Sequence, residues 1–383
     1  MTNWPRKAPQ CDERISEARI QEKMFRGLAR EPRKAIDAVP CLSEHSGEAS
    51  EPEPRNPERV AASFDVDLEA QTKALLEFDR APISLGLYPL VRGGHDRIIL
   101  TGMGGSHLAA LPSWRRLVSR GLAAWWIDAG QLLDNPELVT RDSLLVVTSR
   151  SGICGEAVAL VDRLDETSRP PKIVAITDDL NSPLAEVADC EVLLRSQSLR
   201  PPTGFLNALA AHDYLASMIL NEDSDDVALT ARVVAAERYL TGLGAVARGV
   251  VTNSQMRMAY IGFRGHAATA LYAGMLTMEV TGIAAESYIG GQFRHGPLRW
   301  ADENLTAMVF SGRDRIANAA SRRLAADLVA AGSTVIVVGE ADVPGVIHIR
   351  SPAVHHSGQL AHGVVVGEYF VSTLATQASA RVP

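Results

Sequence analysis

From Arg97 onward the chain alternates short apolar runs with segments of helical periodicity, and the alternation occurs twice. Apolar runs of strand length joined by helical segments are typical of parallel β-α-β units, because parallel strands need a crossover connection. We therefore expect an α/β fold with two successive five-stranded parallel sheets flanked by helices. Proteins of this class bind ligands at the carboxyl ends of their strands, so the functional residues are expected in the loops there.

The expected elements follow from these runs. The strands of the first sheet are predicted at residues 98–100, 123–127, 143–148, 173–176 and 192–194. Those of the second sheet are predicted at residues 259–261, 283–286, 307–310, 334–338 and 346–349. Helices are predicted at residues 68–78, 105–119, 154–164, 182–188, 205–220, 266–279, 314–331 and 359–375.

A different composition precedes the first sheet. Residues 14–39 have the periodicity of an amphipathic helical arm, and an acidic segment with several prolines follows them. We therefore place the arm and its linker at residues 1–60, the first α/β domain at 61–225 and the second at 226–383.

Charge and cysteine usage limit the classes of function. The net charge is -7 and no basic run is present, which argues against a nucleic-acid partner. The four cysteines have neither metal-ligand spacing nor a disulfide pattern, so a cytoplasmic location is expected. The sequence shows no signal peptide and no apolar run of membrane length. It predicts no metal and no cofactor.

The first candidate motif is a glycine-rich turn after the first expected strand, with Gly104, Gly105 and Ser106. Glycines let the backbone approach a ligand closely, which suits a phosphate group. A dinucleotide fingerprint would need a third glycine where this chain has His107, so a nicotinamide site is disfavoured. Asp128 stands near the position of that fingerprint's acidic residue, but it can equally cap the next segment.

The second candidate motif follows the third expected strand of the first sheet and consists of Ser149, Arg150, Ser151 and Gly152. Hydroxyls can hydrogen-bond phosphate oxygens and an arginine can supply charge. The alternative is that the serines merely cap helices, which is common. Because both loops would open on the same edge of one sheet, we favour a phosphate site there.

The third candidate motif lies in the second half. The helix over 266–279 places Leu271, Met275 and Met278 on one face and ends near Glu279. A segment through the Gly290-Gly291 pair then leads to His295, which Gly296-Pro297 follows. A carboxylate and an imidazole could act together on one small ligand. The alternative is an exposed glutamate and a loop histidine without a catalytic role.

Together these residues resemble the sugar isomerase (SIS) domain family, and in particular the isomerase half of glucosamine-6-phosphate synthase and related phosphosugar isomerases, deaminases and deglycases. The resemblance implies tandem SIS domains over residues 85–375. It implies that the serine-rich loop binds the sugar phosphate. It also implies a glutamate that transfers a proton between C1 and C2 of the sugar. In the synthase this glutamate precedes the histidine of a His-Gly-Pro motif by the same number of residues that separates Glu279 from His295. It also implies that a stretch containing Thr203 lines the sugar site, and that the protein is a homodimer.

Departures from the synthase narrow the reaction. No glutaminase domain precedes the tandem domains and position 2 is threonine, so ammonia transfer from glutamine is not expected. No lysine follows Lys172, which excludes a Schiff base from the second half. The substrate is expected to be a phosphorylated sugar or amino sugar, with isomerase, deaminase and deglycase reactions all open. A noncatalytic sugar-phosphate sensor is the alternative of a different class.

Overall fold

The computed structural model of the protein describes residues 69–78, 86–166, 170–196, 204–237 and 256–379. The predicted arm at residues 14–39, the acidic linker and Thr203 lie outside these residues. The domain boundaries at residues 60 and 225 therefore stay predictions. Residues 69–78 are helical, as the sequence predicts.

The first sheet has five parallel strands in the order β2-β1-β3-β4-β5. The strands are β1 (Arg97–Gly102), β2 (Ala124–Trp126), β3 (Ser143–Thr148), β4 (Lys172–Thr177) and β5 (Cys190–Leu193). The helices and helical turns around them are α3 (Leu87–Val91), α4 (Gly104–Ala109), α5 (Leu111–Ser119), α6 (Ala129–Asp134), η1 (Pro136–Leu138), α7 (Gly155–Asp165), α8 (Pro183–Val187) and α9 (Phe205–Leu220). The next helix, α10 (Val227–Glu237), packs mainly against α14 (His356–Ser379) of the second half.

The second sheet repeats this topology with the order β10-β9-β8-β6-β7, all parallel. Its strands are β6 (Arg257–Gly262), β7 (Ala285–Ile289), β8 (Leu305–Gly312), β9 (Thr334–Gly339) and β10 (Ile347–Arg350). Its helices and turns are η2 (Arg264–His266), α12 (Ala267–Thr281), η3 (Gly290–Arg294), η4 (Pro297–Trp300), α13 (Arg315–Ala330) and α14 (His356–Ser379). The predicted pair of five-stranded parallel sheets is confirmed.

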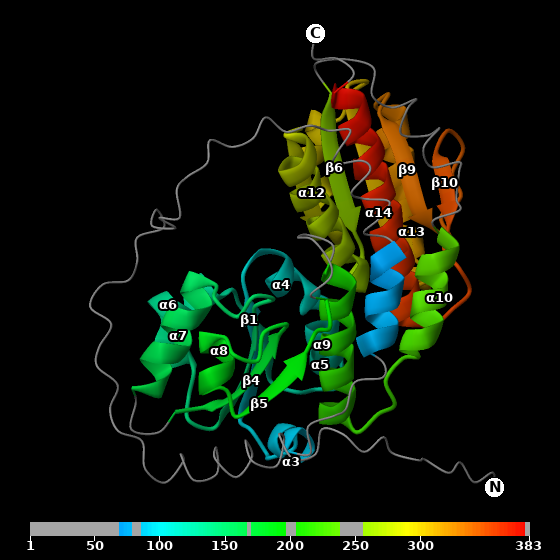
Figure 1. The fold of residues 1–383 in the computed structure, drawn as a ribbon. Coiled ribbons are helices and arrows are strands. Elements are labelled where there is room, and N and C mark those ends of the chain that lie inside the picture. Colours follow the sequence, from blue (N-terminus) through cyan, green and yellow to red (C-terminus); the bar gives the residue numbers. More distant parts are fainter. Residues whose placement is uncertain (1–68, 79–85, 167–169, 197–203, 238–255, 380–383) are drawn as a thin grey trace, which may run out of the picture. The chain divides into compact units, whose positions relative to one another are not determined.

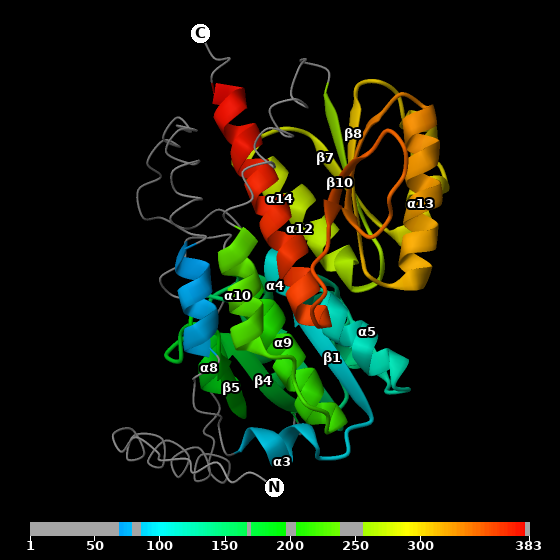
Figure 2. The same cartoon turned by 90° about the vertical axis from the view of Figure 1, so that its right-hand side faces the viewer.

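Each sheet is covered on both faces because alternate residues of its strands point to opposite sides. In the first sheet, Ile99, Leu145 and Val147 face α6, α7 and α8. Leu100 and Val146 face the side covered by α5 and α9. Figure 1 shows these two groups of helices on opposite sides of the first sheet. In the second sheet α13 covers one face while α12 and α14 cover the other, as Figure 2 shows.

The two halves of the chain share an apolar core. Tyr272 and Leu276 of α12 belong to the same buried apolar cluster as Leu100 and Val146 of the first sheet. A buried polar contact adds to it, because Glu368 of α14 accepts hydrogen bonds from Tyr272 Oη at 2.7 Å and from Gln71 Nε2 at 3.1 Å. A fully buried carboxylate needs such donors to offset its lost hydration.

Two predicted helices differ from the observed ones. The helix predicted at 105–119 is two helices, α4 and α5, which meet at Ala110. Pro112 lies in the first turn of α5, where its missing N–H needs no helical acceptor. The predicted face of Leu271, Met275 and Met278 is also wrong, because α12 is buried on both sides and Met278 is 48% exposed. None of the described helices combines the length and the hydropathy that a membrane crossing requires.

Candidate functional site

The first glycine-rich loop lies at the carboxyl end of β1, where the sequence predicts it. Met103 is the N-terminal cap residue of α4, and Gly104 follows it with φ +51°, a conformation that favours glycine. Gly105 and Ser106 form the first turn of α4. The turn is compact, with Ser106 N–H bonded to Met103 O at 3.1 Å.

The second loop follows β3, the immediate neighbour of β1. Its Ser149 is 4% exposed and donates its backbone N–H to Ile176 O at 3.0 Å. The helix after the loop, α7, has Cys154 as its cap residue, without a side-chain capping bond. Since Met103 caps α4 and Cys154 caps α7, the alternative in which these loop serines cap the helices is wrong for Ser149 and Ser151. By contrast, Asp128 does cap α6, accepting from Gln131 N.

Gly152 has a structural role. Its φ is +68°, and a Cβ at this position would overlap Ser182 Oγ and approach Thr177 Oγ1 at 3.1 Å. Ser182 in turn caps α8 by accepting from Ala185 N. Gly152 therefore allows the second loop to pack closely against the start of α8.

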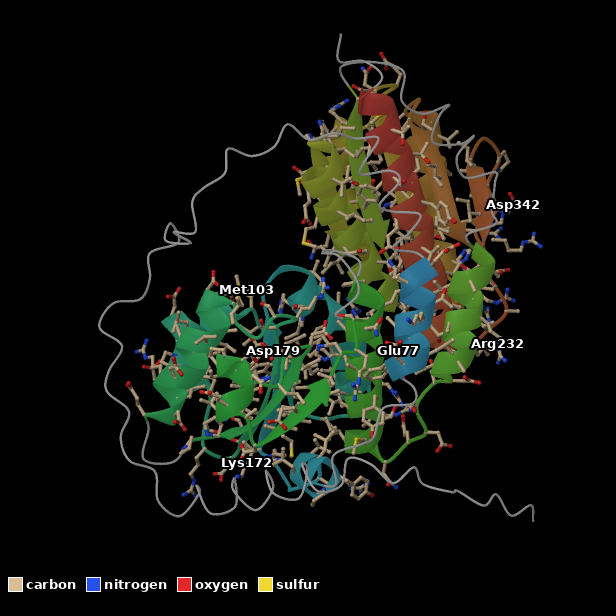
Figure 3. All side chains as sticks on the ribbon, viewed as in Figure 1. Glu77, Met103, Lys172, Asp179, Arg232 and Asp342 are labelled. Carbon is tan, nitrogen blue, oxygen red and sulfur yellow. The ribbon has the colours of Figure 1, made fainter. Side chains whose placement is uncertain are left out.

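The two loops share one cavity of about 890 Å³. Its lining comprises Met103, Gly105 and Ser106 from the first loop, Ser149, Arg150, Ser151, Ile153 and Cys154 from the second, and Asp178, Asp179, Leu194, Gly204, Phe205, Ala208, Tyr272, Met275 and Glu279. Met103 and Asp179, which follow β1 and β4, are labelled in Figure 3. Because β1 and β3 send their chains to opposite sides, this is the switch point where doubly wound sheets bind ligands. The predicted juxtaposition of the serine loops is thus observed.

Glu279 reaches the same cavity from the second half. It lies in the last turn of α12, on the same helical side as Tyr272 and Met275. Tyr272 is held in place because its ring stacks on Phe205 with 4.0 Å between centroids and an interplanar angle of 1°. The exposed Glu279 carboxylate makes no ion pair within the described residues. A carboxylate without a cationic partner is free to accept a proton from a ligand.

His295 is placed differently from the prediction of a shared pocket. It follows η3 in an exposed position and is not among the residues that line the cavity. The preceding helical turn, η3, begins at Gly290, which has a φ of +56°. The structure therefore brings Glu279, but not His295, to the serine loops of the same chain.

Arg150 is already engaged by the protein. Its Nε donates to Asp178 Oδ2 at 3.4 Å, and its Nη2 donates to Ser196 O at 3.0 Å. Asp178 is 6% exposed and also accepts from Ser196 N–H at 2.7 Å. The charge of Arg150 is thus largely offset before a ligand arrives, so the serine hydroxyls are the main candidates for binding an anion.

Asp178 and Asp179 are cavity residues that the sequence reasoning missed. They come directly after β4, at the same carboxyl edge as the two serine loops. Asp179 is exposed, and its Oδ1 accepts from Asn181 N–H at 2.8 Å. The rule that pointed to the first two loops applies equally to this one and would have found both aspartates.

Two histidines lie near the serine loops, His212 buried and His107 half-buried. His212 Nε2 is 2.9 Å from Thr148 Oγ1, and burial lowers the pKa of His212 to about 3. His107 stacks on Trp126 with 4.2 Å between ring centroids. Burial lowers the pKa of His107 to about 4, against an opposing effect of the Asp128 charge. Both rings are therefore neutral at physiological pH.

Comparison with known proteins identifies the fold. Residues 94–218 match the family model of the SIS domain. No curated protein matches the chain in sequence. The C-terminal domain of glucosamine-fructose-6-phosphate aminotransferase from Francisella tularensis is 15% identical with a TM-score of 0.69, covering 83% of this chain and 96% of that chain.

Two further solved structures have the same fold. Tagatose-6-phosphate ketose/aldose isomerase from Escherichia coli is 21% identical with a TM-score of 0.64, covering 84% of this chain and 91% of that one. Glucosamine-6-phosphate deaminase from Thermotoga maritima is 18% identical with a TM-score of 0.62, covering 83% and 94%. Residues 94–218 therefore match the SIS domain, and a second parallel sheet of corresponding strand order follows them.

Proposed function

We propose that this protein is an enzyme that converts a phosphorylated sugar or amino sugar by moving a proton between C1 and C2. The observation that carries the proposal is the composition of one cavity. Ser106, Ser149 and Ser151 of the two loops and Glu279 of α12 line it together. Hydroxyls suited to a phosphate thus share a space of ligand size with a carboxylate suited to proton transfer.

The proposed mechanism divides these tasks. The serine loops hold the phosphate of the open-chain sugar and so position C1 and C2 near Glu279. Glu279 takes the proton from the carbon next to the carbonyl or imine and returns it to the neighbouring carbon, through an enediol or enolamine. A positioned general base of this kind accelerates proton transfer by about 10²–10⁴-fold. His295 is proposed to move the proton that opens the sugar ring.

The charge of the cavity favours an amino sugar over a neutral sugar. Asp178 is paired with Arg150, whereas Asp179 and Glu279 have no cationic partner within the described residues. Two unpaired carboxylates attract an ammonium group and repel a second anion. This observation supports the deaminase or deglycase reaction over a plain aldose–ketose isomerase.

Replacing Glu279 with glutamine tests the proposal. Glu279→Gln keeps the size of the side chain but removes its basicity, so turnover should fall by at least about 10²-fold. Binding of phosphorylated sugars should persist, because the serine loops are unchanged. Product formation from phosphorylated sugars, amino sugars and fructosamines is measured beside thermal stabilisation by the same compounds. Unchanged turnover in the variant contradicts the role of Glu279.

A noncatalytic sugar-phosphate sensor is the second candidate function, because His295 does not line the cavity of its own chain. A sensor needs binding without proton transfer. It predicts that wild-type protein is stabilised by a phosphorylated sugar and releases no product, and that Glu279→Gln behaves like wild type in both assays. Any turnover that depends on Glu279 excludes the sensor.

A further inference from the structure

A second cavity, of about 490 Å³, lies apart from the serine loops. We call it the inter-sheet pocket. Its walls come from α5, α9, α10, η2 and the first turns of α14, so both halves of the chain contribute. Trp114, Leu206 and Leu360 give it an apolar lining, while Arg115 and Arg264 add positive charge. Its volume and mixed lining are those of a small-molecule site.

The loop that enters this pocket from the second half is the counterpart of the glycine-rich loop in the first half. Each follows the first strand of its sheet in chain order, β1 or β6, which lies next to an edge strand, and both strands run from arginine to glycine. Gly104 and Arg264 each stand two residues after that glycine, and their φ values are +51° and +52°. The duplicated fold therefore places a phosphate-type turn at the edge of each sheet.

Arg264 is an unusual residue for this conformation. A residue with a Cβ is strained by roughly 1–2 kcal/mol in the left-handed region, whereas glycine is not. The turn of the first half has glycine at the equivalent position, so the backbone itself does not require a side chain there. The strain in the second half positions a guanidinium, which lies beside the inter-sheet pocket.

The charges around the pocket leave Arg115 unpaired. The neighbouring Arg116 is neutralised by Asp213 at 2.9 Å and Glu222 at 2.8 Å. Arg264 is paired with Asp314 at 2.8 Å, but both side chains are about half exposed, and such surface pairs contribute little energy. Within the described residues Arg115 makes no ion pair, and its buried Nε–H has no acceptor. Burial and the nearby Arg264 charge lower the pKa of Arg115.

Asp225, the other carboxylate of the pocket, is also engaged. It accepts from Ser357 N–H at 2.8 Å and lies 3.2 Å from His355 Nδ1. His356 completes this wall, and burial lowers its pKa, so the ring is neutral at physiological pH. The unsatisfied group of the pocket is thus a cation, Arg115, close to a second cation whose own partner is exchangeable.

We propose that the inter-sheet pocket binds a small organic phosphate between Arg115 and Arg264. A ligand with more than one negative charge would offset the repulsion between the two guanidinium groups. A phosphomonoester has a charge of about -1.5 to -2 at pH 7. Each fork can bind phosphate oxygens in bidentate fashion. The apolar lining accommodates the body of the ligand. The site is independent of the serine loops and does not rest on the proposed reaction.

The test uses inorganic phosphate and a series of phosphomonoesters as probes, with binding measured by calorimetry. Because the serine loops are expected to bind phosphate too, binding is measured in a Ser149→Ala/Ser151→Ala background. We expect one remaining site for the probes. Arg115→Gln and Arg264→Gly should each weaken it about tenfold or more, the usual effect of losing a charge-assisted hydrogen bond.

Arg264→Gly is an informative variant because it restores the residue that the first half has at this turn. It should keep or raise the thermal stability while it loses phosphate, so weaker binding cannot be attributed to unfolding. Arg322→Gln, on the exposed face of α13, is the matched loss of one positive charge. The proposal is overturned if the Ser149→Ala/Ser151→Ala protein binds no phosphate. It is also overturned if Arg115→Gln and Arg264→Gly bind phosphate as tightly as Arg322→Gln does.

Discussion

At the scale of single residues, ion pairs within the protein determine which charged side chains of the candidate active cavity can interact with a ligand. Arg150 is in the loop expected to bind phosphate, yet its guanidinium is held by Asp178 and by the carbonyl of Ser196. Asp179, one residue further, has no cationic partner among the described residues and lines the same cavity. From the residue type alone, Arg150 is expected to supply positive charge to a ligand. The contacts show instead that, in the part of the chain that the structure describes, the charges without an ion-pair partner in the cavity are the carboxylates of Asp179 and Glu279.

Asp179 should therefore select for a ligand with an amine. Asp179→Asn removes its charge while keeping its shape, and it should reduce the preference for an amino-sugar phosphate over the hydroxyl analogue by about tenfold. Competition binding with the two sugars measures that ratio. Asp134→Asn, an exposed carboxylate at the end of α6, is the control. If the ratio in Asp179→Asn equals that in the control, the carboxylate does not contact the amine.

The lowered pKa values of His212 and His107 predict acid sensitivity. In the folded protein the pKa of His212 is about 3 and that of His107 is about 4, both below the ordinary value of 6.5. Below pH 6.5 the unfolded chain binds more protons than the folded one, so the free energy of unfolding falls as pH decreases toward 4. Urea denaturation between pH 7 and pH 4.5 measures this slope. His212→Gln, which keeps a hydrogen-bonding group near Thr148, should flatten it. Equal slopes in both proteins would contradict this assignment.

At the scale of helices and strands, the apolar pattern of the sequence predicts the strands better than the faces of the helices. All ten strands lie where the apolar runs place them, within a few residues at each end, because buried parallel strands are continuous apolar runs. The helix α9 coincides with its predicted bounds, Phe205–Leu220. The pattern failed for α12, where the predicted amphipathic face assumed solvent on the opposite side. Helices of the first half and the second sheet cover α12 instead, and sequence periodicity cannot reveal such distant neighbours.

The same limit applies to the site. The two serine loops and Glu279 could be named from local motifs, because each motif lies within a short stretch of chain. Tyr272 and Met275, by contrast, enter the cavity through the packing of α12 against the first half, which is a tertiary arrangement. The expectation that His295 shares the cavity rests on a resemblance, and His295 is not among the described residues that line the cavity of its own chain.

Gly152 allows a direct test of the second loop. Gly152→Ala adds a methyl group at φ +68° that would overlap Ser182, so it should lower the free energy of unfolding by more than about 1 kcal/mol. Gly155→Ala is the matched control, since a Cβ at Gly155, in the first turn of α7, meets nothing within 4 Å. We expect the control to stay within about 0.5 kcal/mol of wild type. Chemical denaturation of both variants measures the difference, and equal stability would show that the loop can relax.

At the scale of the whole molecule, the position of His295 leads us to propose that two chains contribute to one site. The histidine is exposed in its own chain and lies outside the cavity that holds Glu279. The predicted homodimer would let the segment from Gly290 to His295 reach the cavity of a second copy. A two-fold pair is also the commonest form of soluble oligomer.

Mixing two inactive variants tests this arrangement. Glu279→Gln and His295→Ala proteins are combined under conditions of subunit exchange, and turnover is measured. If the two residues meet across the dimer, each mixed dimer regains one intact site, and random exchange should restore about a quarter of the wild-type activity. Exchange itself is verified with differently tagged chains. No recovery despite complete exchange would place both residues in one chain.

The helix α9 is a wall of both cavities. Phe205 and Ala208 face the serine loops, whereas Leu206, Leu209 and Asp213 face the inter-sheet pocket. A ligand that shifts or stiffens this helix from one side changes the free energy of binding on the other side. Thermodynamic linkage then requires reciprocity: the factor by which an occupant of the inter-sheet pocket alters substrate affinity is the factor by which substrate alters the affinity of that occupant.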